Sequence, residues 1–105
     1  MQFIVCGTPE FKEGLWQIVG RCTSDVHVGK RFLEYFPYTV IRSPDNLEIQ
    51  SEYGTPRPIN LLVEKIVAYR HEFETLSSGM TCLLIASGDA SDLTDDVILR
   101  GASDE

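Results

Sequence analysis

The chain has 105 residues and a mass of 11.8 kDa, with 16 acidic and 9 basic residues and a net charge of −7 at pH 7. Its apolar fraction of 43%, with only 5 prolines and 8 glycines, is typical of an ordinary globular domain and excludes a disordered or collagen-like chain. The length predicts a single domain over residues 1–100, and we expect residues 101–105 to form a disordered acidic tail.

The first predicted elements are a strand and a helix. Residues 2–6 contain Phe, Ile and Val before a glycine, which predicts a buried strand. Thr8 and Pro9 then resemble a helix N-cap and first helical residue, and Gly20 is suited to the helix end. The apolar face of this predicted helix consists of Phe11, Leu15, Ile18 and Cys22.

The next region has an ambiguous half and a clearer half. Residues 23–37 fit both periods, because Val26 and Val28 alternate like a strand while Val28, Phe32 and Tyr35 recur at helical spacing, and we expect Pro37 to end either element. From residue 38 to residue 49, apolar and polar residues alternate on both sides of a turn at residues 43–46, which predicts a hairpin.

The strongest local pattern lies between residues 59 and 76. Large apolar residues recur there at spacings of three and four, which predicts an amphipathic helix: Ile59, Leu62, Ile66, Tyr69, Phe73 and Leu76. Residues 80–86 then predict a buried strand. Ser91 or Asp92 could cap a short last helix that runs to Arg100.

Taken together, these elements predict an α+β fold in a small single-domain sandwich. Their order matches the βαββαβ arrangement of ferredoxin-like domains, with a short C-terminal helix added. This architecture supports many unrelated functions, so the expected fold assigns none.

The net charge is concentrated near the C-terminus. Residues 88–105 hold six acidic residues and one basic residue, a net charge of −5. A nucleic-acid or anionic membrane surface requires clustered basic residues, and the chain has none beyond Lys30 and Arg31. We therefore expect a basic protein partner, such as a nuclease or another nucleic-acid-binding protein, and no direct binding of nucleic acid or membrane.

The densest cluster of possible ligand groups consists of Asp89, Asp92, Asp95 and Asp96. Carboxylates bind hard cations, but the spacing does not fit a calcium-binding EF-hand loop, and helix capping explains the same residues. We expect these four residues to contact a partner rather than a metal. No cofactor, metal or catalytic site is predicted, because neither His27 nor His71 forms a recognisable pair with a nucleophile.

Cellular location is predicted from the absence of other signals. The longest uncharged run spans residues 79–88, about half of a membrane-spanning segment, and residues 1–3 lack a basic secretory start. Three cysteines without a C-x-x-C motif predict reduced thiols. These features together predict a cytoplasmic protein.

Two classes of function remain open from the sequence. The first is a small acidic inhibitor of the immunity-protein, antitoxin or phage-antagonist kind, which is compatible with the short length and concentrated acidity. The second is a small enzyme or ligand-binding domain with an unidentified pocket, or an accessory or scaffold subunit. The sequence also leaves a homodimer open.

Overall fold

The computed structural model describes residues 1–42 and 49–101, and every regular element in these ranges is a strand. The predicted α+β fold, its ferredoxin-like version and the C-terminal helix are therefore wrong. The strands are β1 (Gln2–Val5), β2 (Glu10–Lys12), β3 (Leu15–Cys22), β4 (Val26–His27), β5 (Arg31–Arg42), β6 (Ile49–Tyr53), β7 (Arg57–Ala68), β8 (His71–Phe73), β9 (Thr75–Leu76), β10 (Thr81–Gly88) and β11 (Val97–Gly101).

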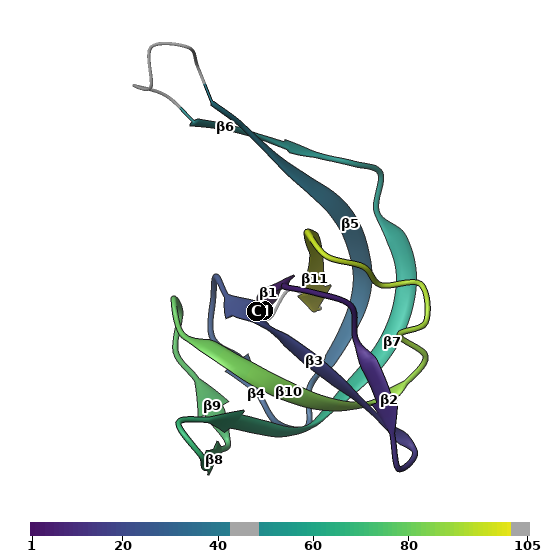
Figure 1. Cartoon of the computed structure of the whole chain (residues 1–105), viewed down its shortest axis with the longest axis vertical. Coiled ribbons are helices and arrows are strands. Elements are labelled where there is room, and N and C mark those ends of the chain that lie inside the picture. Colours follow the sequence, from purple (N-terminus) through teal and green to yellow (C-terminus); the bar gives the residue numbers. More distant parts are fainter. Residues whose placement is uncertain (43–48, 102–105) are drawn as a thin grey trace.

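The strands form a closed antiparallel barrel (Figure 1). Following the hydrogen-bonded neighbours gives the order β5, β11, β1, β3, β10 and β7, and an additional pairing of β7 with β5 closes the ring. β2 pairs with β3, and β8 pairs with β7. β4 and β9 form a separate two-stranded sheet. β5 continues beyond the barrel and pairs with β6, so this hairpin projects from the body in Figure 1.

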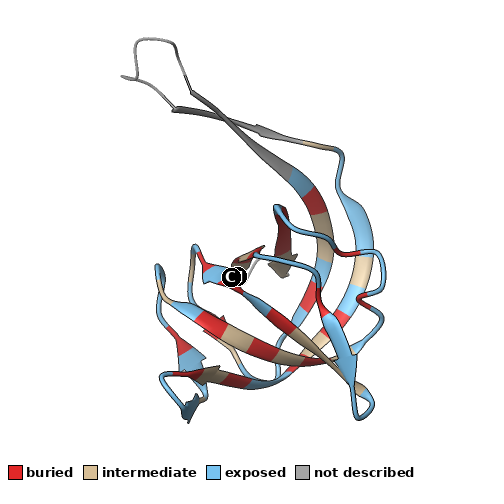
Figure 2. Ribbon diagram, in the orientation of Figure 1, coloured by how far each residue is buried: buried red, intermediate tan, exposed pale blue. Residues whose placement is uncertain are grey.

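The core lies inside the barrel. Along β1, β3 and β10, buried residues alternate with exposed or half-buried ones (Figure 2), as expected when one face of each strand points inward. In β11, three consecutive residues are buried. The Phe3 and Phe32 rings meet there, with centroids 6.4 Å apart. No polar or charged residue is buried among the described residues, so apolar side chains fill the interior.

The segment predicted as the long helix is instead β7, β8 and β9. In β10, Ile85 is paired with Lys65 and Ala86 with Val63, so Glu64 is an extra residue at a β-bulge. Inward-facing residues of β7 are two apart on either side of the bulge and three apart across it. The residues in the core are therefore Leu61, Val63, Ile66 and Ala68. The predicted stripe instead combines the two faces of β7, because Ile66 is buried in the core whereas Leu62 is only half-buried.

The turn after β7 completes the false pattern. Tyr69 and Arg70 have φ angles of 52° and 65° between paired Ala68 and His71, as in the two-residue turns that suit hairpins. Gly and Asn favour such turns, and this chain uses neither there, so the turn has no sequence signal. Tyr69 is 75% exposed and lies outside the core in which the helix would have placed it.

The segment predicted as the first helix is a hairpin of β2 and β3. Glu13 and Gly14, with φ angles of 54° and 82°, form the turn between paired Lys12 and Leu15. Gly20 does not end an element but lies within β3, where an added Cβ would stand 2.0 Å from the Ile4 carbonyl oxygen. Glycine is therefore required there by the close approach of β1.

The remaining predictions have mixed outcomes. The strands at residues 2–6 and 80–86 are confirmed as β1 and β10, and the ambiguous residues 23–37 contain β4 and the start of β5. Pro37 does not end its element but lies within β5, opposite Val97 of β11, at the point where the pairing on the other side of β5 passes from β7 to β6.

The strands of the predicted hairpin at residues 38–49 are confirmed as β5 and β6, which pair from Tyr38 and Tyr53 to Arg42 and Ile49. The predicted turn at residues 43–46 lies outside the described residues. Of the predicted tail, Gly101 pairs with Phe32 at the end of β11, and residues 102–105 lie outside the described ranges, so that prediction stays open.

Candidate binding site

The four predicted site residues lie on one loop. The predicted C-terminal helix is replaced by strand β11 and by the segment that joins β10 to it, residues 89–96, which we call the acidic loop. All four residues are exposed on this loop: Asp89, Asp92, Asp95 and Asp96.

The acidic loop is fixed to the barrel at several points. Ala90 and Leu93 are each 1% exposed and belong to the core, and the Leu93 amide donates to the Ala90 carbonyl at 3.1 Å. Near the end of the loop, the Asp96 amide donates to the Val5 carbonyl of β1 at 3.1 Å. The loop therefore presents its carboxylates from a fixed backbone.

Two of the carboxylates contribute to this fixation. The Asp89 Oδ1 accepts hydrogen bonds from the Ser91 hydroxyl at 2.6 Å and from the Ser91 amide at 2.9 Å. These two bonds, the hydroxyl bond first, lower the pKa of Asp89 below its ordinary value of 3.8. The Asp95 Oδ1 accepts from the Gly7 amide at 2.8 Å, which ties the loop to the segment after β1.

The other two carboxylates, those of Asp92 and Asp96, have no hydrogen bond or ion pair with any described residue. Among the residues that the structure describes, the ion pairs join Lys65 to Glu72 and Arg100 to Glu34. The charges of Asp92 and Asp96 are therefore uncompensated by contact.

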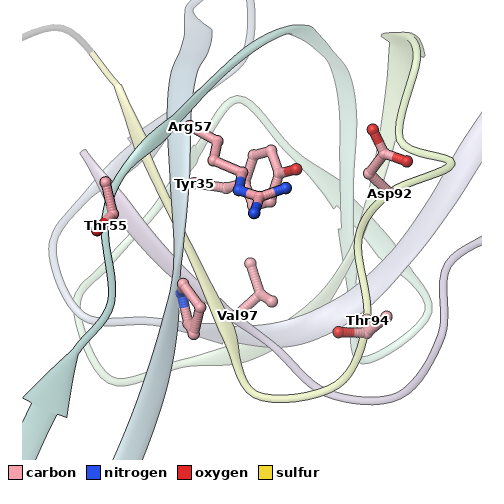
Figure 3. Close-up of a pocket in the computed structure, with 7 residues that line it drawn as sticks. Tyr35, Thr55, Arg57, Asp92, Thr94 and Val97 are labelled. Atoms are coloured by element: carbon pink, nitrogen blue, oxygen red, sulfur yellow. The ribbon is translucent and has the colours of Figure 1, made fainter.

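Asp92 also lines a pocket of about 500 Å³ together with Val97 of the core and Tyr35, which packs against the core (Figure 3). Arg57, Tyr35 and Val97 converge in the middle of this view, with Thr55 on one side and Asp92 and Thr94 on the other. Pro37 completes the described lining. Strand pairing brings four of these residues together: Tyr35 of β5 is the cross-strand partner of Arg57 at the start of β7, and Pro37 of β5 is that of Val97 in β11.

A second pocket, of about 450 Å³, shares Tyr35 and Asp92 with the first, so the two lie side by side. Its other lining residues are Pro58, Ile59, Asn60, Gly88 and Asp89. This pocket lies where β10 stops pairing with β7, at the Gly88 and Leu61 pair.

The sequence did not predict that Tyr35 or Arg57 belongs to a site. They are separated by more than twenty residues and lie more than thirty from the acidic loop in the chain. Only the β5–β7 pairing brings them together. Neither carries a local motif, so no signal in the sequence could have identified them.

The residues considered for nucleophilic chemistry have other partners. The Cys22 thiol is buried and donates to the Ser77 carbonyl at 2.8 Å, whereas the His27 Nδ1 forms a hydrogen bond with the Thr75 hydroxyl at 3.0 Å. Burial, followed by the charge of nearby Cys22, raises the pKa of Cys82 to about 12. Cys22 and Cys82 are thus buried free thiols, and Cys6 is an exposed one.

The described residues contain neither a metal-binding cluster nor a membrane-spanning helix. Within residues 1–42 and 49–101, no three His, Cys, Asp or Glu side chains are arranged to hold a metal ion. Nor does this part of the chain contain a helix long and apolar enough to cross a membrane.

Comparison with protein families, with curated proteins and with solved structures gives no match to this chain. The acidic loop and its two pockets are therefore the features that bear on function.

Proposed function

We propose that this chain is a small protein-binding inhibitor, of the immunity-protein, antitoxin or phage-antagonist kind, that engages a basic partner through its acidic loop. Such a partner could be a nuclease or another nucleic-acid-binding protein, since these present the clustered basic residues that four carboxylates would complement.

One observation carries the proposal: the acidic loop is fixed to the barrel while the charges of Asp92 and Asp96 have no partner among the described residues. A loop that is already ordered loses little conformational freedom on binding, so more of the interaction energy is available as affinity. Exposed carboxylates of one sign also attract a basic surface before contact and increase the association rate.

The test uses the four aspartates together. Replacing Asp89, Asp92, Asp95 and Asp96 by Asn removes four charges with little change in size. The parent and the variant, both immobilised, are first used to capture proteins from a lysate of the source cell. Association rates of a captured basic protein are then measured from about 0.01 M to 0.1 M salt, over which the Debye length falls from about 30 Å to about 10 Å.

We expect the parent to associate fastest at low salt, and the variant to associate more slowly with a flatter salt dependence. Thermal unfolding of both proteins is the control, because Asp89 and Asp95 also hold the loop. An unchanged association rate in a folded variant would contradict the proposal and leave these residues with a structural role.

A second candidate function is the binding of a small ligand that carries both a cation and an anion. It is favoured by Arg57 and Asp92, which line one pocket without forming an ion pair with each other. A ligand of this kind would neutralise both charges. Saturable binding of free amino acids, with loss on replacing Arg57 by Gln, would favour this function over protein binding.

A further inference from the structure

The two pockets beside Tyr35 differ in charge. The pocket bounded by Asp89 and Asp92 contains no Lys, Arg or His among its described lining residues, whereas the adjacent pocket contains Arg57. Because Tyr35 and Asp92 line both, the two pockets form one groove with an anionic part and a mixed part.

We infer that this groove binds a short extended segment of the partner protein, with one Lys or Arg side chain in the anionic pocket and the neighbouring main chain against Arg57. This inference rests on the proposed function and deepens it, because it names where the partner binds and by which kind of side chain.

The lining of the anionic pocket suits a long basic side chain. Asp92 offers a carboxylate that no described residue already pairs with, and Pro58 and Ile59 offer apolar surface to the methylene stem. The Tyr35 ring adds an aromatic surface of the kind that attracts cations. A volume of about 450 Å³ lies within the usual range for sites that enclose a side chain or small ligand.

The main chain of β7 favours an extended guest. β10 pairs with β7 from Leu61 onward, so residues 57–60 have β5 on one side and no described strand on the other. Exposed strand edges bind extended peptides in many complexes. Arg57 at the start of this stretch can donate to the carbonyl groups of such a segment.

The groove makes a prediction that a diffuse acidic surface does not. Asp92 lines both pockets, whereas Asp96 belongs to the same loop but is not among the described residues that line the groove. Neither carboxylate has a described partner within the chain, so Asp92→Asn and Asp96→Asn are matched changes of charge.

The experiment titrates the isotope-labelled chain with a blocked pentapeptide, acetyl-Gly-Gly-Arg-Gly-Gly-amide, and follows backbone amide shifts by NMR. The same peptide with citrulline in place of Arg is the uncharged control. We expect saturable shifts at Asn60, Asp89 and Asp92 with the Arg peptide only. Asp92→Asn should weaken binding about tenfold, and Asp96→Asn less than about twofold.

Three results would overturn the inference: no saturable shift up to 10 mM peptide, equal weakening by the two Asn variants, or equal binding of the citrulline peptide. Each leaves the proposed function open, because that is tested separately with the captured partner and the fourfold variant. Unchanged amide spectra away from the substituted residue establish that both single variants are folded.

Discussion

The barrel interior and the acidic loop are held by different forces. Inside the barrel, packing is entirely apolar among the described residues, with Phe3, Leu61 and Leu84 each 0% exposed. The acidic loop exposes four charged side chains and depends on two buried residues and a few hydrogen bonds. Burial in the interior thus stabilises the domain, and the acidic loop holds its charges in place because it is attached to that stable barrel.

This difference explains why a binding site can lie on the acidic loop. Hydrophobic burial is non-directional and cooperative, so a change in the interior affects the whole molecule. Hydrogen bonds at a loop are directional and local, so a loop can open while the sheet remains paired. Three predictions test this division, in decreasing order of expected effect.

The largest effect is expected in the barrel interior. Ile66 is 0% exposed, and Ile66→Ala should lower the free energy of unfolding by about 2 to 5 kcal/mol through lost burial and a residual cavity. Leu62 in the same strand is only half-buried, so Leu62→Ala should cost about half as much or less. Denaturant unfolding measures both, and equal costs would contradict the inward phase set by the bulge at Glu64.

A smaller and more local effect is expected at the loop anchor. Leu93 is 1% exposed and belongs to the core, so Leu93→Ala should lower the free energy of unfolding by about 2 kcal/mol, the low end of the range for buried leucine. Hydrogen exchange should show most of this loss at Gly7, whose amide is bonded to Asp95, because the loop opens first.

The amide of Leu84 in β10, at the centre of the sheet, serves as the internal control in the same exchange measurement. Its protection should fall only by the global loss of stability. An equal increase in exchange at Gly7 and Leu84 would indicate that the loop and barrel unfold as one unit.

The smallest effect concerns Asp89. Its pKa in the folded chain lies below 3.8 because Ser91 donates to the ionised carboxylate. The stability that the ionised Asp89 carboxylate adds is present above its pKa in the unfolded chain and is lost as pH falls through its lower pKa in the folded chain. The hydrogen bonds from Ser91 should therefore weaken only below about pH 4.

Ser91→Ala removes the hydroxyl bond and leaves the amide bond, so the pKa of Asp89 should rise toward 3.8 without reaching it. Carboxyl NMR titration of parent and variant measures the change. An unaltered pKa would show that the hydroxyl does not stabilise the charged form.

The sequence predicted some strands well and others as helices, for a physical reason. Residues four apart share a face in a strand and nearly share one in a helix, so Ile18 and Cys22 fit both periods. The false helical stripe over residues 59–76 combined both faces of β7, because half-buried Leu62 and buried Ile66 lie four apart across the bulge at Glu64. It also included Tyr69, which is exposed in the turn after β7.

The candidate site was partly predictable. Clustering in the chain was sufficient to identify Asp89, Asp92, Asp95 and Asp96 as candidates, although a helix was predicted for this segment. Tyr35 and Arg57 were not predictable, because they join the site through pairing between strands distant in the chain.

Residue type and local order were sufficient to predict the strands at residues 2–6 and 80–86 and the concentration of acidic charge after Gly88. They did not predict that the chain forms a barrel, which way each strand faces, or which residues meet Asp92 in a groove. Those outcomes depend on the closure between β5 and β7 and on the bulge in β7, and both arise from contacts between residues that local spacing does not relate.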